Sequence, residues 1–187
     1  MILLHVFAES PRYARRQAPL HRRLHQWGPG MARQDLHIWH QPTGDDLRYE
    51  QAIRQFWGRD DLLIVEGDML PTRAQIQGLR QCPHPVCTQH YVVNAFRLSP
   101  QRHRNLTAVH DPESRTWYSG LGCFRLRRDW MRTHPPTFPW GTWNGRRQPG
   151  LPWGPWPQAL DWRLTGWISG PQATMIHVHY PDCRHFH

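Results

Sequence analysis

The chain has 187 residues, a length that suits one domain with a single core, and no period recurs that would indicate a repeat array. All 23 basic residues are arginine; with 14 acidic residues, the formal charge is +9 and the pI is near 10.4. This charge favours a polyanionic partner, nucleic acid or a phosphate-bearing ligand, although a lysine-free chain rich in Trp and Pro is also typical of a G+C-rich genome.

The first part of the chain alternates predicted strands and helices, judged from runs of apolar residues and their spacing. In chain order we expect a strand over residues 2–7, a helix over 13–27, a strand over 35–40, a helix from Asp45 or Asp46 to about Trp57, and a strand over 61–66. Helices between strands imply right-handed crossovers, and therefore parallel pairing.

The second part is less regular. In chain order we expect a short helix after its cap Thr72, a strand over residues 86–96, a helix over 159–168 and a last strand over 173–180. Residues 133–157 hold Pro, Gly and Trp at a density that neither helix nor strand tolerates. We therefore predict an α/β fold, with one domain over 1–187, a mostly parallel central sheet flanked by helices, and a Trp/Pro-rich loop insertion.

The amino-terminal segment and the cysteines indicate the compartment. The apolar run at residues 2–7 has no basic segment before it and is too short for a signal peptide or a membrane span, so we expect a cytoplasmic protein. The four cysteines are too few for a disulfide scaffold of this length, and we expect reduced thiols.

Two acidic residues, Glu66 and Asp68, follow the strand over 61–66. Ligands of parallel α/β sheets lie beyond the carboxyl ends of strands, and two carboxylates there can hold a hard divalent cation that neutralises a diphosphate. Gly67 removes bulk where a ligand approaches. The alternative interpretation, more common on spacing alone, is a turn followed by a helix cap.

Four motifs in chain order favour the first interpretation, a metal site at Glu66 and Asp68. The segment "LLIVEGDMLPTRAQIQGLRQCPHPVCTQHYVV" resembles the core of short, family-2-like glycosyltransferases of the GT-A fold, a Rossmann-like fold whose strand ends in a D-x-D triplet. Downstream, "SGLGCFRL" (119–126) resembles their glycine loop, "LDW" (160–162) their acceptor-site acid, and "HVHYPD" (177–182) their metal-binding histidine. The triplet departs from the pattern by carrying Glu66 first.

The resemblance implies a metal site and a donor site. Asp68 would coordinate Mn²⁺ or Mg²⁺, Glu66 would contact the donor sugar, its ribose or the metal through water, and His177 or His179 would complete the coordination, with His177 favoured. Donor binding is further implied for Ser10, Pro11, Arg12, Gly120 and Gly122. The donor would be a UDP- or GDP-sugar.

Catalysis is implied for Asp161, as the base that takes the proton from an acceptor hydroxyl in an inverting displacement. Each assignment has a structural alternative. Asp161 is equally typical of a helix cap, the two histidines of an ordinary exposed strand, and the two glycines of a turn. The arginines after the first strand also fit a solvated helix face.

The acceptor is predicted from the charge. Relatives of this glycosyltransferase group occur in phages beside base hydroxylases, which implies sugar transfer to 5-hydroxymethylcytosine in double-stranded DNA, in the host cytoplasm if the chain is phage-encoded. Such an enzyme rotates the base out of the duplex. The residues expected to contact DNA are Arg125, Arg127, Arg128, Trp143, Arg146 and Arg147. The alternative acceptor is a glycan or a small molecule.

A hypothesis from another class is a zinc-stabilised nucleic-acid-binding protein without catalysis. The segment "CPHPVCTQH" offers four soft ligands in a short stretch, namely Cys82, His84, Cys87 and His90. Two prolines and the absence of a second, separated ligand pair make this spacing poor for a tetrahedral site. The competing interpretation is that both cysteines are core thiols on either side of a turn.

Overall fold

The computed structural model describes residues 1–8, 36–41, 46–67, 69–94, 103–105, 109–111, 116–137 and 160–185. Several predictions fall outside these residues: the helix over 13–27, the donor residues Ser10, Pro11 and Arg12, the metal ligand Asp68, and Trp143, Arg146 and Arg147. Most of the predicted loop insertion, from 138 to 157, lies outside them too. A single domain over the whole chain stays a prediction.

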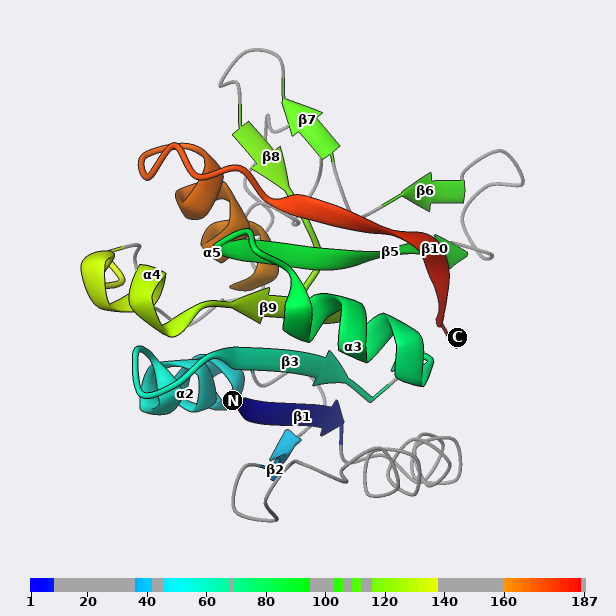
Figure 1. The fold of residues 1–187 in the computed structure, drawn as a ribbon, viewed down its shortest axis with the longest axis horizontal. Helices are drawn as coiled ribbons and strands as arrows, with labels where there is room; N and C mark the ends of the chain where they lie inside the picture. Colours follow the sequence, from blue (N-terminus) through cyan, green and yellow to red (C-terminus); the bar gives the residue numbers. More distant parts are fainter. Residues whose placement is uncertain are drawn as a thin grey trace.

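A mixed sheet forms the centre of the molecule (Figure 1). Its order is β2 (Leu36–Gln41), β1 (Ile2–Ala8), β3 (Leu62–Glu66), β9 (Cys123–Leu126), β5 (Val86–Asn94), β10 (His177–His185) and β4 (Met69–Leu70), with β6 (His103–Asn105) paired to β5. The pairings make β2, β1, β3, β5 and β10 run in one direction, while β9 and β4 run against them. The predicted α/β class with a mostly parallel sheet flanked by helices is confirmed.

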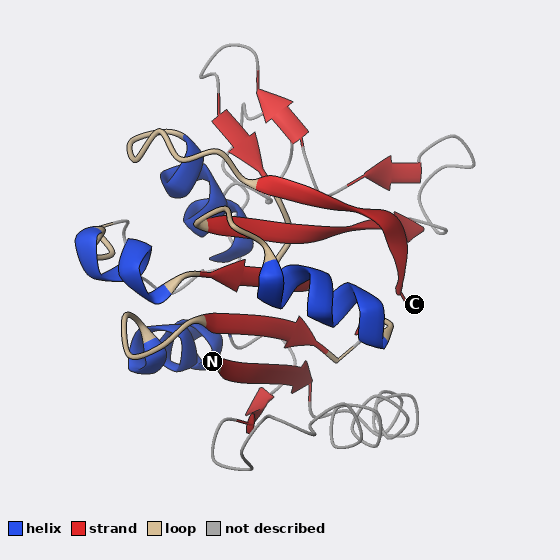
Figure 2. Cartoon of the chain, in the orientation of Figure 1, coloured by secondary structure: helices blue, strands red, loops and turns tan. Residues whose placement is uncertain are grey.

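Helices cover both faces of the sheet (Figure 2). On one face α2 (Asp46–Phe56) and α5 (Leu160–Ser169) pack against the even-numbered residues of β3, including Leu62 and Ile64. On the other face α3 (Arg73–Gln81) packs against the odd-numbered Leu63 and Val65. Because side chains alternate along a strand, neighbouring residues of β3 serve different cores. We call these faces the α2/α5 face and the α3 face.

The regular elements follow from local signals in the sequence. β3 is a run of branched apolar residues whose first four members are fully buried, as expected for a strand covered on both faces. The predicted Thr72 cap of α3 is confirmed: Thr72 Oγ1 accepts from Gln75 N at 3.2 Å, and Gln75 Oε1 accepts from Thr72 N at 2.8 Å. Local chemistry therefore fixes where α3 begins.

Several elements differ from the sequence-based expectation. β9 lies within the predicted glycine loop and runs antiparallel between β3 and β5, and α4 (Arg128–Thr133) follows it in a stretch expected only as a basic run. β10 continues past the predicted end at residue 180, through a cis bond between Tyr180 and Pro181. A hairpin of β7 (Val109–Asp111) and β8 (Thr116–Tyr118) stands apart from the sheet. Within the described residues no helix combines the length and apolarity needed to cross a membrane.

Candidate functional site

The strands β1 and β3 end at one edge of the sheet, which we call the carboxyl edge, and Glu66 is the last residue of β3. The backbone N–H of Glu66 donates to Gly122 O at 2.9 Å, and that of Gly67 donates to Val6 O at 2.7 Å. On the α2/α5 face, the hydroxyl of Tyr49 donates to Glu66 Oε1 at 3.0 Å. These contacts hold the Glu66 carboxylate in place directly beside the predicted glycine loop.

The glycine loop joins this edge to α5. Ser119 N donates to Thr165 Oγ1 at 3.0 Å, and Thr165 Oγ1 donates to Ser119 O at 3.2 Å. At the other end of the loop, a Cβ on Gly122 would lie 2.8 Å from Met69 Sδ and 2.9 Å from Tyr91 Cζ. Gly122 is therefore required by close packing, whatever it does for a ligand.

The direction of α5 places its first turn, which includes Asp161, toward the carboxyl edge. Near the other end of the helix, Trp167 packs on Trp57 and Trp130, with ring centroids 6.1 and 5.9 Å away. Trp57 follows α2 and Trp130 lies in α4, both at the amino edge, where β3 begins. The backbone of Asp161 is thus on the side of the glycine loop; its side chain lies outside the described part of the chain.

A buried ion pair that the sequence analysis missed lies on the α2/α5 face. Arg163 of α5 donates to Glu50 of α2, whose side chain is 2% exposed. The pair links the two helices of the α2/α5 face one residue from Tyr49. The available signal was a charge at the border of an apolar helical stripe, since Glu50 stands three residues from the fully buried Ile53.

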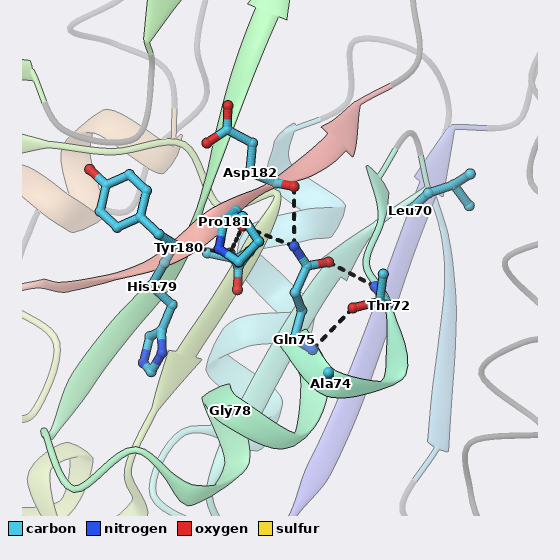
Figure 3. Close-up of a pocket in the computed structure, with 10 residues that line it drawn as sticks. Leu70, Thr72, Ala74, Gln75, Gly78, His179, Tyr180, Pro181 and Asp182 are labelled. Atoms are coloured by element: carbon cyan, nitrogen blue, oxygen red, sulfur yellow. Dashed lines mark hydrogen bonds between the residues drawn. The ribbon is translucent and has the colours of Figure 1, made fainter.

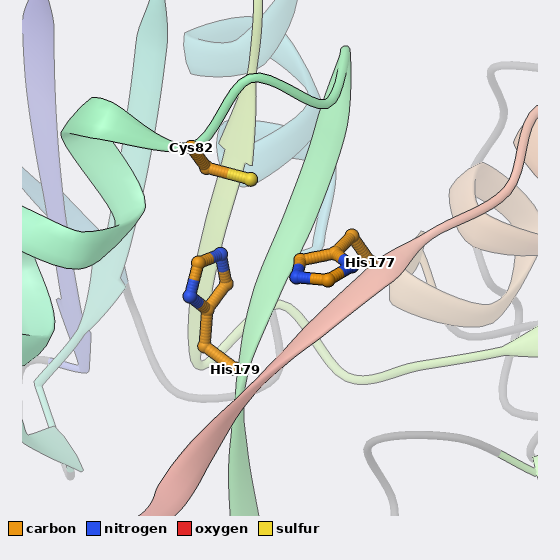
Figure 4. A group of neighbouring side chains, drawn as sticks. All are labelled: Cys82, His177 and His179. Carbon is orange, nitrogen blue, oxygen red and sulfur yellow. The ribbon is translucent and has the colours of Figure 1, made fainter.

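The two predicted metal-binding histidines lie elsewhere, on the α3 face (Figure 4). His177 and His179 pair in register with Cys87 and Gln89 of β5, so β5 and β9 separate them from β3. Glu66 points to the opposite face, toward Tyr49. Within the described residues neither histidine lies near Glu66, so a hard metal ion at the carboxyl edge would be bound without them.

The histidines meet Cys82 instead. One ligand atom each from Cys82, His177 and His179 lies within 4.8 Å of the others, and we call these three residues the Cys–His cluster. The ring of His84 stacks on that of His177 with centroids 4.2 Å apart. Burial, then neighbouring histidines, lower the pKa of both His177 and His179. Both rings are therefore favoured in the neutral form that binds metals.

The zinc-ligand set predicted from "CPHPVCTQH" is not assembled. Cys87 is buried, its thiol donates to Leu79 O at 3.8 Å, and burial raises its pKa to about 12. His90 is bonded to Asp182, 2.6 Å between Nδ1 and Oδ1, and stacks on Tyr180. Cys82 alone of that set joins a group of ligands within the described residues.

The predicted DNA contact of Arg125 is wrong for this fold. Its side chain is 2% exposed, and its guanidinium donates to Asp61 Oδ2 at 2.7 Å and to Cys82 O at 2.8 Å. Arg128 is exposed and Arg127 half-buried, but both follow β9 at the amino edge, with Arg128 N donating to Asp61. These two arginines therefore lie at the far end of β3 from Glu66.

A cavity of about 480 Å³ opens on the α3 face between the start of α3 and β10 (Figure 3). Gln75 spans it, donating from Nε2 to Pro181 O at 2.9 Å and Asp182 O at 3.2 Å. His179 lines the cavity. The hollow therefore borders the Cys–His cluster and lies on the opposite face of the sheet from the Glu66 carboxylate.

Comparison with known proteins gives a fold and no family. No protein family and no curated protein matches the chain. Among solved structures, A197 from STIV is similar over 100% of this chain and 86% of its own length, with a TM-score of 0.52 and 12% identity.

Two further solved structures give lower scores. A glycosyltransferase involved in the glycosylation of the major capsid of PBCV-1 has a TM-score of 0.46, 12% identity, and coverage of 97% of this chain and 83% of that one. A putative glucose-1-phosphate thymidylyltransferase from Bacillus anthracis has a TM-score of 0.41, 9% identity, and coverage of 97% and 88%. At these identities it is the likeness to A197 that supports the fold, and the activity has to be argued from the chain itself.

Proposed function

We propose that the chain transfers a sugar from a nucleotide-diphosphate donor to an acceptor hydroxyl at the carboxyl edge. One observation carries the proposal: hydrogen bonds join three segments far apart in the sequence. Glu66 is bonded to Gly122, and the same loop is bonded through Ser119 to α5, the helix of Asp161. These are three of the four motifs in which the sequence resembles GT-A glycosyltransferases.

The proposed roles follow from this arrangement. Glu66 is a carboxylate fixed by Tyr49 where a donor sugar or its ribose would lie. Asp161 is the base that takes the proton of the acceptor hydroxyl, an effect worth about 10²–10⁴ in rate. The donor-binding roles of Ser10, Pro11, Arg12, Gly120 and Gly122 remain part of the proposal.

The divalent ion of the proposal fits the carboxylates and does not fit the histidines. Mn²⁺ and Mg²⁺ prefer oxygen ligands, which Glu66 and the adjacent Asp68 would supply. The imidazoles of His177 and His179 lie on the other face of the sheet beside the thiol of Cys82, and these donors suit softer metals. Bound at the carboxylates, a hard cation would offset the charge of the donor diphosphate.

For the acceptor we propose 5-hydroxymethylcytosine in DNA, supported by the charge of +9. Arg125 has no part in this contact because it is buried, and Arg127 and Arg128 would reach DNA only at the amino edge. Trp143, Arg146 and Arg147 remain part of the proposal as DNA contacts. A glycan or small-molecule acceptor is the other outcome of the experiment below.

The test is mass spectrometry of nucleosides from 5-hydroxymethylcytosine DNA incubated with the protein, Mn²⁺ or Mg²⁺ and a panel of UDP- and GDP-sugars, with nucleotide release measured in parallel. We expect a hexose-sized gain that Asp68→Asn and Asp161→Asn each reduce by about 10²-fold or more. Asp129→Asn, an exposed acid on α4, is the matched control and keeps full turnover.

The outcomes separate the two levels of the proposal. Nucleotide release that depends on Asp68, without modified DNA, keeps the transferase and moves the acceptor to another molecule. Absence of turnover with every donor overturns the transferase. A gain that survives in both acidic variants would place the chemistry away from the carboxyl edge.

A further inference from the structure

The described residues contain a second group of chemically active side chains, on the face of the sheet that the proposed transferase does not use. We propose that Cys82, His177 and His179 bind one zinc-like metal ion, which ties the last strand, β10, to the end of α3. The site is separate from the proposed glycosyl transfer and from its hard divalent cation. It also differs from the four-ligand zinc set predicted from the sequence.

The ligands stand on regular elements that already aim them at one point. Cys82 is the C-cap residue of α3, held by a hydrogen bond from its N–H to Leu79 O at 3.3 Å. His177 and His179 are two residues apart on β10, so their side chains leave the same face of the strand. Figure 4 shows a ring nitrogen of His179 directed toward the thiol of Cys82, with the ring of His177 beside them.

The distances are those of a preformed site that has yet to contract. The three ligand atoms lie within 4.8 Å of one another. In a tetrahedral zinc site, with Zn–N about 2.0–2.1 Å and Zn–S about 2.3 Å, ligand atoms are about 3.3–3.6 Å apart. A movement of about 1 Å closes the site, which small side-chain rotations can provide.

His179 supplies an independent observation. Its Nε2 atom is buried and has no hydrogen-bond partner among the described residues. A buried polar nitrogen without a partner is unfavourable, and such atoms are rare in folded proteins. A metal ion at this position gives Nε2 the partner it lacks. The cavity that His179 lines gives the ion a route from solvent.

The chemistry of the donors selects the metal. Two imidazoles and a thiolate favour zinc and similar ions over Mg²⁺ and Mn²⁺, which prefer oxygen. His84 lies parallel to His177, 16° between ring planes, so their in-plane lone pairs do not converge on one ion. His84 is thus a positioning residue for the His177 ring, and water fills the fourth coordination position.

The local charge permits an ion. Arg125 lies close to the cluster, donating to Cys82 O at 2.8 Å, and its charge alone would repel a cation. Asp61 neutralises Arg125 through a contact of 2.7 Å, and the thiol of Cys82 becomes a thiolate when it binds the metal. The site therefore gains one negative charge as the ion enters.

The experiment is a Co²⁺ titration of chelator-treated protein under a thiol-free reductant, followed by displacement with Zn²⁺. We expect one Co²⁺ per chain, a thiolate-to-cobalt absorption band in the near ultraviolet, and tighter binding of Zn²⁺ than of Co²⁺. Cys82→Ser should abolish the thiolate band, and His179→Gln should weaken Zn²⁺ binding at least 10-fold. Cys183→Ser, a buried thiol on the same strand as the histidines, is the matched control.

Thermal unfolding provides the second readout and guards against misfolded variants. Zn²⁺ at about 100 times its Kd should raise the Tm of the wild type by about 5–10 °C, and should not move that of Cys82→Ser. The Tm of each variant without metal shows whether it still folds. If Cys82→Ser or His179→Gln does not fold, His177→Gln takes its place, because His177 is only half-buried.

Several results would overturn the proposal: absence of uptake, Co²⁺ binding without a thiolate band, or unchanged affinity in Cys82→Ser. The zinc site and the proposed transferase can each be overturned without the other. Glu66→Gln should leave Zn²⁺ binding unchanged, and Cys82→Ser should leave nucleotide-sugar turnover unchanged. A zinc site in a protein without turnover would keep this inference and remove the transferase.

Discussion

Among the described residues, each face of the sheet holds a buried pair of an arginine and a carboxylate, and the two pairs are built in opposite ways. On the α2/α5 face the acid is inside: the side chain of Glu50 is 2% exposed and that of its partner Arg163 is 15% exposed. On the α3 face the arginine is inside: the Arg125 side chain is 2% exposed and that of Asp61 28%. The exposed fraction of the acid decides how each pair responds to mutation and to pH.

The two faces also differ in the chemistry of their polar groups. On the α2/α5 face, at the carboxyl edge, the contact of Tyr49 with Glu66 joins two oxygens. Near Arg125 the polar groups are thiols and imidazoles. Because a strand sends alternate residues to opposite faces, one sheet keeps a hard-ligand region and a soft-ligand region apart.

The pair on the α2/α5 face should be the most costly to break. Arg163→Met leaves the carboxylate of Glu50 without its ion-pair partner from α5, and we expect a loss of about 3–5 kcal/mol in the free energy of unfolding. The double variant Glu50→Leu with Arg163→Met removes both charges and should recover most of that loss. Urea unfolding measures both values; equal losses in the single and double variants would contradict a buried-charge penalty.

Two glycines, one at the carboxyl edge and one in α3, should respond with opposite signs. In Gly122→Ala the new Cβ meets Met69 Sδ at 2.8 Å, so we expect a loss of about 1–3 kcal/mol from overpacking. In Gly78→Ala the nearest atom, His179 Nδ1, is 3.8 Å away, and alanine is the better helix former. We expect that variant to gain up to about 1 kcal/mol. Thermal unfolding of the two variants side by side decides this, and a loss in both would show that α3 packs more tightly than the distance indicates.

The local features of this structure could be predicted from the sequence. The buried run of β3, the capping box at Thr72 and the alternation of His177 with His179 are signals within a few neighbouring residues, and the structure bears out all three. The alternation of predicted strands and helices likewise indicated the α/β fold before any contact was known.

What the sequence could not supply is the choice of partners across strands. Cys82 and His177 are 95 positions apart, and they meet because β10 pairs with β5 in one particular register. The insertion of β9 between β3 and β5 sets the histidines three strands from Glu66. Arg125 resembles a surface residue in a basic run until the pairing of β9 turns it inward beside Asp61. Long-range register thus decided which predicted ligands and phosphate contacts lie together.

The capping box of α3 tests whether the Cys–His cluster depends on its supporting helix. Thr72→Ala removes the acceptor for Gln75 N, and we expect a loss of about 1 kcal/mol in the free energy of unfolding. Thr72→Ser keeps the hydroxyl and should be close to wild type. Since Cys82 caps the far end of the same helix, the Zn²⁺ affinity should change less than the stability does. A parallel loss of both would mean that the helix frays along its whole length.

The pair of Arg125 and Asp61 on the α3 face should affect how stability changes with acid. It should have a smaller effect on the free energy of unfolding at neutral pH. Burial alone would raise the pKa of Asp61, but hydrogen bonds from Arg125 and from Arg128 N, with the charge of Arg125, lower it below its usual 3.8. The unfolded chain therefore takes up the proton at a higher pH than the folded chain does. The stabilisation is complete above the unfolded pKa and is lost as the pH falls through the folded one.

The free energy of unfolding, measured by urea at a series of pH values from about 6 to 2, should accordingly fall less steeply with acid in Asp61→Asn than in the wild type. Asp129→Asn removes an exposed carboxylate from the neighbouring helix and is the control for a general change of charge. Parallel curves for the wild type and Asp61→Asn would contradict this prediction. They would mean that the ion pair of Asp61 with Arg125 does not lower the pKa of Asp61 in the folded chain.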